Sequence, residues 1–358
     1  MDSILVNTES RQYPVYLGNN VIEKLTPFIK INYQSATKVF IITDETVGKL
    51  HLPALMDQLK ELQPAFFQVP SGEQAKSFPV YYEAMTAALE AGLDRNSLLL
   101  AFGGGAVGDV GGFVAATFMR GIPFIQIPTT ILAHDSAVGG KVAINHHLGK
   151  NLIGAFYQPE AVFYDLNFLD TLPIGEKRSG FAEVIKHALI QDADFYNWLI
   201  KNVTNLEFLT KNQLSYCLEK GINIKARIVS IDERENGIRA YLNFGHTLGH
   251  AIESEIGYGE ITHGEAVMIG MGFALRMSKE LLNLNFDVEG FIKWVRDLGY
   301  RTEVPANLTA ESLLKKMKQD KKSVGKLVNF VLLEKLGQPI LKQIMDETLL
   351  SQLSVNKH

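Results

Sequence analysis

The fold is decided by the stretch Leu98-Leu99-Leu100-Ala101-Phe102-Gly103-Gly104-Gly105-Ala106-Val107-Gly108-Asp109. Its first five residues form a continuous apolar run, which predicts a strand buried on both faces of a parallel sheet. The glycines that follow satisfy G-x-G-x-x-G between that strand and an apolar helical stretch, where backbone N–H groups can face a pyrophosphate. The stretch therefore predicts a dinucleotide-binding turn, although such glycines also serve tight turns and close helix packing.

Short apolar runs of the same kind recur between about Lys38 and Asp165, separated by amphipathic segments such as Tyr81–Leu89. The runs are Val39–Thr43, Phe66–Val69, Phe124–Ile127 and Ala161–Tyr164. Strands that alternate with helices are typical of βαβ units. We therefore expect an N-terminal Rossmann-like domain with a parallel sheet over residues 1–172.

Longer helical stretches dominate after Pro173, and strand-like runs are nearly absent until Leu327–Leu333. The predicted helices are Glu176–Ile190, Phe195–Asn202, Gln213–Ser230, Leu248–Ser254, Gly264–Leu282 and Phe291–Leu298. A proline pushes its predecessor out of the α region, so Thr171-Leu172-Pro173 is the expected junction. The fold class is thus α/β, with a mostly α-helical C-terminal domain over residues 173–358.

Composition indicates a globular enzyme of the cytoplasm. The 358 residues carry 35 Lys+Arg and 39 Asp+Glu, a formal net charge of −4, and no basic stripe points to nucleic acid. Residues 1–5 lack the positive start of a signal peptide, and the most apolar stretch, residues 98–118, is interrupted by Asp109 and glycines, so no membrane span is expected. Cys217 is the single cysteine, which excludes an intramolecular disulfide.

The expected dinucleotide fingerprint lacks one part. In the standard fingerprint, an acidic residue about 20 positions after the glycines holds the ribose hydroxyls. No Asp or Glu lies between Val110 and His134, whereas Asp44 directly follows the run Val39–Thr43. We therefore expect the ribose of a nicotinamide dinucleotide to meet Asp44 and its phosphates to meet Gly103–Gly105.

Polar segments follow the predicted strands at the ends where open α/β sheets bind ligands. They are Ser71–Lys76, Thr129-Thr130, and the loop Asp135–Lys141, with Gly149-Lys150-Asn151 soon after it. Lys141 and Lys150 stand near glycines, which lets an ammonium group approach an anion closely. These lysines predict a substrate with more than one negative group; the alternative is that both are ordinary surface lysines.

Histidines and a carboxylate in the C-terminal half predict a metal site. His246 and His250 are spaced i,i+4, His263 stands just before a predicted helix, and Glu183 and Lys186 are spaced i,i+3 on one helix face. Two imidazoles and a carboxylate suit zinc with one position open to substrate. The residues alone leave open which imidazoles ligate among His187, His246, His250 and His263.

Further polar residues of this half lie in apolar or motif-like surroundings: Lys186, Lys225, Arg239 and Asn243. Arg239 precedes Asn243 by four residues, which would align the two side chains if one helix covers both. The run Lys315–Lys318 predicts a solvated helix face. Three lysines near Asp320 stay undecided as substrate contacts: Lys321, Lys322 and Lys326.

Taken in order along the chain, these segments resemble 3-dehydroquinate synthase, a family of sugar phosphate cyclases. The resemblance is carried by Gly103–Asp109, Met119–Ile122, Pro128–Thr130, Asp135–Lys141, Gly149–Gly154, Ala182–Lys186, Asn243–His250, His263–Ala266 and Asp320–Lys322. The matches run from about Asp44 to Leu333. One departure is visible: the loop Ile131–His134 is one residue shorter than the family's commonest form, with His134 in place of a Gln-Val pair.

The resemblance implies a phosphorus–oxygen lyase that converts 3-deoxy-D-arabino-heptulosonate 7-phosphate to 3-dehydroquinate and phosphate. This is a step of the shikimate pathway, which leads to chorismate and the aromatic amino acids. It also implies NAD, one divalent metal ion per subunit (Zn²⁺ first, Co²⁺ second), and a cytoplasmic homodimer without nucleic-acid or membrane partners.

The resemblance also assigns roles to residues. The implied metal ligands are Glu183, His246 and His263. The implied NAD contacts are Asp44, Ser71, Gly72, Glu73, Gln74, Ala75, Lys76, Gly103, Gly104, Gly105, Ala106, Val107, Gly108, Asp109, Thr129, Thr130, Lys141, Lys150, Phe168, Leu169, Asp170 and Thr171. The implied catalytic and substrate residues are Asp135, Lys141, Lys150, Asn151, Lys186, Lys225, Arg239, Asn243 and His250, with Arg120 reaching the phosphate site of a neighbouring subunit.

Three other classes of protein remain open. A metal-dependent NAD alcohol or glycerol dehydrogenase would use a carboxylate and a histidine four residues apart, which Glu183 and His187 satisfy. The substrate of such an enzyme would not carry two negative groups for the cationic side chains to bind. These cations are Lys141, Lys150, Lys186 and Arg239. Another sugar phosphate cyclase would act on a different sugar phosphate. The presence of a carboxylate on the substrate distinguishes the two, and Arg239 with Lys225 favours a substrate that carries one. A regulatory nucleotide-binding protein would need neither the metal ligands nor the anion sites.

Overall fold

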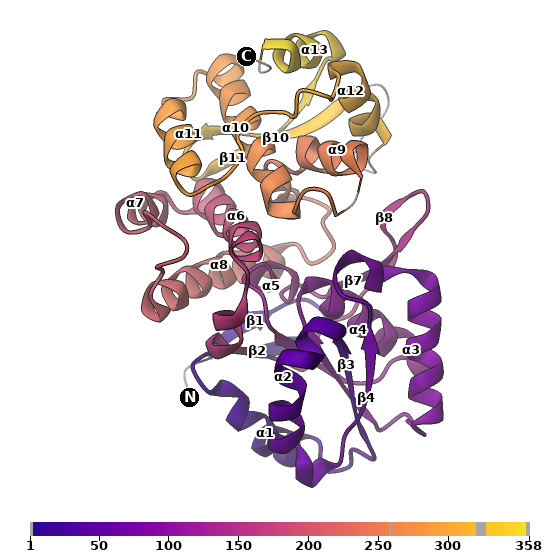
Figure 1. The fold of residues 1–358 in the computed structure, drawn as a ribbon. Coiled ribbons are helices and arrows are strands. Elements are labelled where there is room, and N and C mark those ends of the chain that lie inside the picture. The colour runs from indigo at the N-terminus through magenta and orange to yellow at the C-terminus, as the bar shows by residue number, and fades with distance from the viewer. Residues whose placement is uncertain (1–2, 258, 320–326, 356–358) are drawn as a thin grey trace. The chain divides into compact units, whose positions relative to one another are not determined.

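The computed structural model describes residues 3–257, 259–319 and 327–355 (Figure 1). The chain groups into two compact units, residues 1–172 with 214–234 and residues 173–213 with 235–358. One boundary falls after Leu172, at the predicted junction. Residues 214–234 were placed in the C-terminal half, but they pack in the first unit, because helical periodicity does not reveal which unit covers an apolar face.

The first unit is built on a seven-stranded sheet with the order β1-β2-β9-β6-β5-β3-β4. Its strands are β1 (Ile4–Asn7), β2 (Gln12–Gly18), β3 (Val39–Asp44), β4 (Ala65–Val69), β5 (Leu98–Gly103), β6 (Phe124–Pro128) and β9 (Ala161–Asp165). Neighbours pair in parallel except in the β1–β2 hairpin at one edge. The parallel α/β prediction is confirmed. The short strands β1 and β2 were not predicted, because their side chains do not form a continuous apolar run.

Helices cover both faces of this sheet (Figure 1). Successive residues of β5 point to opposite faces: Leu99 and Ala101 join one core, while Leu98 and Leu100 join the other. The helical elements are η1 (Val21–Lys24), α1 (Leu25–Asn32), α2 (Glu45–Gln58), η2 (Lys60–Leu62), η3 (Gly72–Lys76), α3 (Phe78–Glu90), α4 (Gly105–Thr117), η4 (Phe118–Arg120), α5 (Ala133–Ser136) and η5 (Leu166–Thr171). Helix α8 (Lys211–Ile231) contributes most of its length to this unit.

An antiparallel hairpin, β7 (Lys141–His146) with β8 (Gly149–Phe156), packs against α4. The sequence predicted polar loops here, and that prediction was wrong: Lys141 opens β7, and Gly149–Asn151 opens β8. The hairpin approaches α4 closely, since a Cβ at Gly112 would lie 2.4 Å from Cγ1 of Val142. Residues 142–144 of β7 are buried, but the polar residues at the hairpin tip interrupt the apolar run, so the sequence pattern did not predict a strand.

The second unit is mostly helical, as predicted. Its elements are α6 (Ile174–Gln191), α7 (Ala193–Asn202), η6 (Ile238–Asn243), α9 (His246–Ile256), α10 (His263–Leu282), α11 (Val288–Asp297), α12 (Ala310–Gln319) and α13 (Asp346–Val355), with a hairpin of β10 (Val328–Lys335) and β11 (Gln338–Ile344). Helix α10 is central, because α6, α9 and β10 all pack against it. Within the described residues, none of the helices combines the length and apolarity that crossing a membrane would require.

Candidate functional site

The glycine-rich segment lies at the junction of β5 and α4. Strand β5 ends at Gly103, Gly104 has an extended backbone at the N-cap of α4, and no side chain caps that helix. A Cβ at Gly104 would lie 3.0 Å from Cγ2 of Thr130, and one at Gly105 would lie 3.0 Å from Oγ of Ser136. The turn is therefore packed tightly, and its helix N-terminus suits an anion.

Asp44 ends β3, the strand beside β5, and caps α2. Its Oδ1 accepts hydrogen bonds from the N–H groups of Thr46 and Val47 at 2.9 and 3.0 Å. The hydroxyl of Ser71 donates to the same oxygen at 3.0 Å. Because β3, β4 and β5 are parallel, Asp44, Ser71 and the glycine turn all follow strands at one edge of the sheet.

Lys76 is buried in a polar network. Its ammonium donates to Oδ2 of Asp109 at 2.6 Å and to the side-chain oxygen of Asn151, with Oε1 of Glu73 at 3.8 Å. The amide of Asn145 donates to Glu73 at 2.7 Å. Burial alone would lower the pKa of Lys76, but the carboxylates of Asp109 and Glu73 outweigh it and raise that pKa. The network joins η3, α4 and the β7–β8 hairpin.

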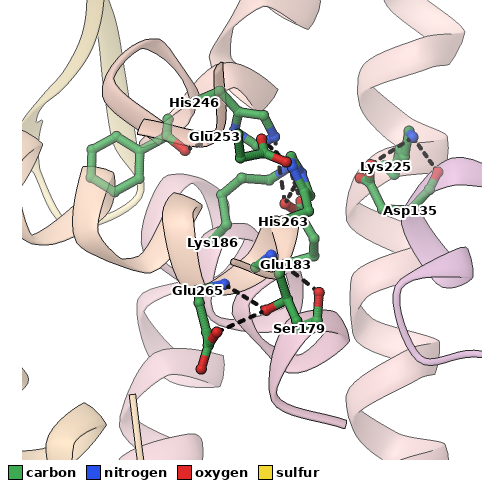
Figure 2. Close-up of polar contacts among 12 residues, drawn as sticks. Asp135, Ser179, Glu183, Lys186, Lys225, His246, Glu253, His263 and Glu265 are labelled. Carbon is green, nitrogen blue, oxygen red and sulfur yellow. Dashed lines mark hydrogen bonds and ion pairs between the residues drawn. The ribbon is translucent and has the colours of Figure 1, made fainter. Parts of the chain in front are cut away.

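A second buried cation lies on α8. Lys225 forms an ion pair with Oδ2 of Asp135 at 3.1 Å and donates to the backbone carbonyl of the same residue (Figure 2). The neighbouring His134 is fully buried, and its Nδ1 donates to the carbonyl of Ile131 at 2.6 Å. The loop Ile131–His134 is thus closed by an internal hydrogen bond.

The remaining predicted residues of the first unit are distributed over several segments. Thr129 and Thr130 follow β6, and Phe168–Thr171 form the end of η5. Lys141 is exposed at the start of β7, and Lys150 is half-buried in β8. Arg120 is exposed at the end of η4 with a left-handed φ of 71°.

In the second unit, three helices bring Glu183, His246 and His263 together (Figure 2). Glu183 lies within α6, and the two histidines are the first residues of α9 and α10. Oε1 of Glu183 lies 3.5 Å from Nε2 of His246 and 3.6 Å from Nε2 of His263. A ligand atom from each lies within 4.8 Å of the others. A carboxylate oxygen and two imidazole nitrogens at this spacing could hold a metal ion, and these donor types suit zinc.

Burial keeps His246 suited to metal binding. It lowers the pKa of His246 well below its usual value; the carboxylate of Glu183 opposes this shift, and the ammonium group of Lys186 adds to it. A neutral imidazole keeps a lone pair for a metal. Lys186, one turn along α6, donates to the carboxylate of Glu183, and both side chains are almost fully buried.

Glycines permit the close approach of these helices. A Cβ at Gly264 would lie 2.0 Å from the backbone oxygen of Ser179 on α6, and one at Gly270 would lie 1.9 Å from that of Gly245. The N–H of Gly264 also donates to Oγ of Ser179 at 3.1 Å. Residue 263 is held beside α6 because residue 264 has no side chain.

Arg239 and Asn243 lie on η6, not on a shared α-helix. The sequence allowed for their alignment at i,i+4, but Gly245, with a φ of +81°, separates η6 from α9. A 3₁₀-helix has three residues per turn, so residues four apart do not align. Arg239 is 1% exposed, and the amide of Asn243 donates to Oε1 of Glu235 at 2.7 Å. The sequence did not single out Glu235.

His250 lies one turn after His246 on α9, with ring centroids 5.2 Å apart. Glu253 follows on the same helix, is 3% exposed, and lies 3.1 Å from Nδ1 of His263 through its Oε2. Sequence reasoning missed Glu253, although its spacing of seven residues from His246 places it on the same helix face. The undecided lysines lie outside the described residues: Lys321, Lys322 and Lys326.

The fold matches that of sugar phosphate cyclases. A 2-deoxy-scyllo-inosose synthase structure with carbaglucose-6-phosphate, NAD⁺ and Co²⁺ matches at a TM-score of 0.90 and 25% identity, covering 99% of this chain and 100% of that one. A 2-epi-5-epi-valiolone synthase from Streptomyces hygroscopicus with NAD⁺ and Zn²⁺ has the same fold, with a TM-score of 0.85, 22% identity and 96% coverage of both chains.

Family models for the N-terminal and C-terminal parts of 3-dehydroquinate synthase match residues 66–179 and 180–323. A 3-dehydroquinate synthase of Bacillus cytotoxicus is 51% identical over 354 residues, 99% of this chain and 96% of that protein. The chain belongs to the 3-dehydroquinate synthase family, which confirms the resemblance and makes the protein an enzyme. The dehydrogenase and regulatory alternatives receive no comparable support.

Proposed function

We propose that this enzyme converts 3-deoxy-D-arabino-heptulosonate 7-phosphate to 3-dehydroquinate and inorganic phosphate, using NAD and one divalent metal ion. The observation that carries the proposal is the convergence of Glu183, His246 and His263 in a chain whose two halves both match this family. The related cyclase structures with NAD⁺ and Co²⁺ or Zn²⁺ support the cofactors, with Zn²⁺ preferred for this donor set.

The nucleotide is proposed to bind at the carboxyl edge of the sheet. The unblocked N-terminus of α4 at Gly103–Gly105 would hold the pyrophosphate, and Asp44 would hold a ribose. The other predicted contacts, from Ser71–Lys76 to Phe168–Thr171, would complete that site. When bound, NAD supplies a reversible hydride acceptor, and the metal supplies Lewis acidity toward a substrate hydroxyl.

The side chains proposed to bind substrate match its charge. Lys141, Lys150, Lys225 and Arg239 would hold the phosphate and the carboxylate, and fixed positive charge stabilises a departing phosphate. Lys186 would act beside the metal ligand Glu183, to which it already donates. The remaining proposed contacts are Asp135, Asn151, Asn243 and His250, with His250 positioned to relay a proton.

A cytoplasmic homodimer is part of the same proposal. Arg120 is exposed and, like Met119 before it, has a positive φ, which is uncommon for residues other than glycine. We propose that this backbone presents Arg120 to the phosphate site of a second subunit. Sedimentation of the protein in solution tests the dimer, and cell fractionation tests the location.

The deciding experiment measures phosphate release from the heptulosonate phosphate together with NADH absorbance, with and without a chelator. We expect phosphate release without net NADH and loss of release after chelation, because substrate and product are at the same oxidation level. Accumulation of NADH with glycerol would indicate a dehydrogenase. Faster turnover of a hexose phosphate lacking a carboxylate would indicate a different cyclase.

A further inference from the structure

A buried carboxylate outside the predicted ligand set lies directly behind one of the predicted ligands. Glu253 belongs to α9, and its Oε2 lies 3.1 Å from Nδ1 of His263 at the start of α10. Only 3% of Glu253 is exposed. A buried carboxylate at hydrogen-bonding distance from an imidazole restrains both the position and the protonation of that ring.

The two nitrogens of His263 face two different carboxylates. Nδ1 faces Glu253 at 3.1 Å, and Nε2 faces Oε1 of Glu183 at 3.6 Å. His246 is oriented in the same sense: its Nδ1 lies 3.2 Å from the carbonyl oxygen of Phe244, and its Nε2 lies 3.5 Å from Oε1 of Glu183. A carbonyl oxygen only accepts, so Nδ1 of His246 carries the proton and Nε2 is left for a metal.

We propose that Glu253 is a positioning residue of the metal site, accepting the Nδ1–H of His263 so that Nε2 faces the metal. This inference rests on the proposed function, because it takes Glu183, His246 and His263 as the ligands. A carboxylate behind a ligating histidine fixes its tautomer and orientation and increases its basicity. Glu253 thus accepts the Nδ1–H of His263, as the Phe244 carbonyl accepts that of His246.

A second arrangement of the same residues competes with this one. His250, Glu253 and His263 also offer ligand atoms within 4.8 Å of one another. In that set Glu253 would bind the metal directly, and His263 would ligate through Nδ1. The convergence of both Nε2 atoms on one oxygen of Glu183 favours the first arrangement. The two arrangements differ in which variants lose the metal.

The experiment compares Glu253→Gln and Glu253→Ala in the full-length protein with Glu255→Gln as a matched control. Glu255 lies on the same helix but pairs with Lys316 at 3.9 Å. The Zn²⁺ dissociation constant is measured by competition with a chromophoric chelator. We expect Glu253→Gln to weaken Zn²⁺ binding about 10-fold and Glu253→Ala up to about 100-fold, because the amide oxygen of glutamine still accepts a hydrogen bond.

Two further readouts separate positioning from a merely structural role. Nitrogen-15 NMR of labelled histidines in the Zn²⁺-loaded protein should show His263 protonated at Nδ1, and Glu253→Ala should change that signal. NAD affinity should stay unchanged in all three variants. If Glu253→Ala does not fold, Glu253→Gln still decides the question.

Unchanged Zn²⁺ binding in Glu253→Gln, in a protein whose His246→Ala variant loses Zn²⁺, would overturn the positioning role and leave the proposed metal site standing. Loss of Zn²⁺ in His250→Ala, with Zn²⁺ retained in His246→Ala, would support the second arrangement, make Glu253 a ligand and also overturn the positioning role. Retention of Zn²⁺ by both Glu183→Ala and His246→Ala would remove the proposed metal site, and the positioning role with it.

Discussion

At the scale of single residues, burial decides the reactivity of the side chains. Cys217 on α8 is completely buried, and this burial raises its pKa to about 12. The thiolate is the nucleophile, so a thiol with such a pKa is almost entirely unreactive near neutral pH.

We therefore expect the folded protein to resist a thiol-specific chromogenic reagent at pH 8 and to react stoichiometrically after unfolding in urea. The measurement is the labelling rate with and without denaturant, with free cysteine as the control. Fast labelling of the native protein would contradict the burial of Cys217.

A second prediction at this scale concerns His246. We expect His246→Ala to lose stoichiometric metal and more than about 100-fold of turnover, since Lewis-acid stabilisation contributes several kcal/mol. Exposed His147 in the β7–β8 turn provides the control His147→Ala, which should keep both properties. Metal analysis of the purified variants alongside phosphate release makes the comparison; full activity in His246→Ala without metal would remove it from the ligands.

At the scale of elements, the candidate metal site depends on how closely three helices approach. Gly264 lets α10 contact the backbone of α6, whereas a Cβ at Gly175, in the first turn of α6, would meet nothing within 4 Å. The two glycines form a matched pair for testing this approach.

We expect Gly264→Ala to destabilise the protein by about 1–3 kcal/mol, because the added methyl would overlap the carbonyl of Ser179. It should also weaken Zn²⁺ binding by displacing His263. Gly175→Ala should leave stability equal or higher. Urea unfolding and chelator competition measure the two effects; equal behaviour of both variants would argue against a tight α6–α10 contact.

Glu233 follows α8, which ends at Ile231, and links this segment to the β1–β2 turn. Its carboxylate accepts from the N–H and hydroxyl of Ser10 at 2.9 and 2.5 Å and from the amide of Gln158 at 2.7 Å. Burial alone would raise the pKa of Glu233, but these hydrogen bonds outweigh it and lower that pKa.

A lowered folded-state pKa contributes stability above the unfolded value, roughly pH 4.3, and that contribution is lost as the pH falls through the folded value. We therefore expect Glu233→Gln to be less stable than the parent protein at neutral pH. When the pH is lowered from neutral to below roughly 4.3, the variant should lose less stability than the parent does. Urea midpoints at a series of pH values test this; parallel curves for the two proteins would contradict it.

The elements also show what the sequence could and could not predict. Strands β3, β5, β6 and β9 were predictable because they are buried on both faces and carry continuous apolar runs. The β7–β8 hairpin was not, because polar residues at its tip interrupt the pattern. The spacing of His246 and His250 could not rank them as ligands, since only the approach of α6 and α10 distinguishes them. The role of Glu253 could not be predicted either, because it depends on the contact between α9 and His263 of α10.

At the scale of the whole molecule, the proposed metal ligands all come from the second unit. A metal that binds only the folded state stabilises it by RT ln(1 + [L]/Kd), about 2.7 kcal/mol at 100 times Kd. We expect chelation to lower the melting temperature and to increase amide hydrogen exchange in α6, α9 and α10, but not in the seven-stranded sheet. His246→Ala should show no response to chelator, and exchange that rises only in the sheet would contradict the ligand assignment.

The return of residues 214–234 to the first unit has a consequence for biosynthesis. When Leu172 leaves the ribosome, that unit still lacks residues 214–234, which include Lys225, the partner of Asp135, and Glu233, the partner of Ser10. It is complete only after residue 234, a difference of 62 residues. At about 5–20 residues per second this is a delay of roughly 3–12 s. A gene truncated after codon 172 therefore encodes a first unit without the residues that pair with Asp135 and Ser10.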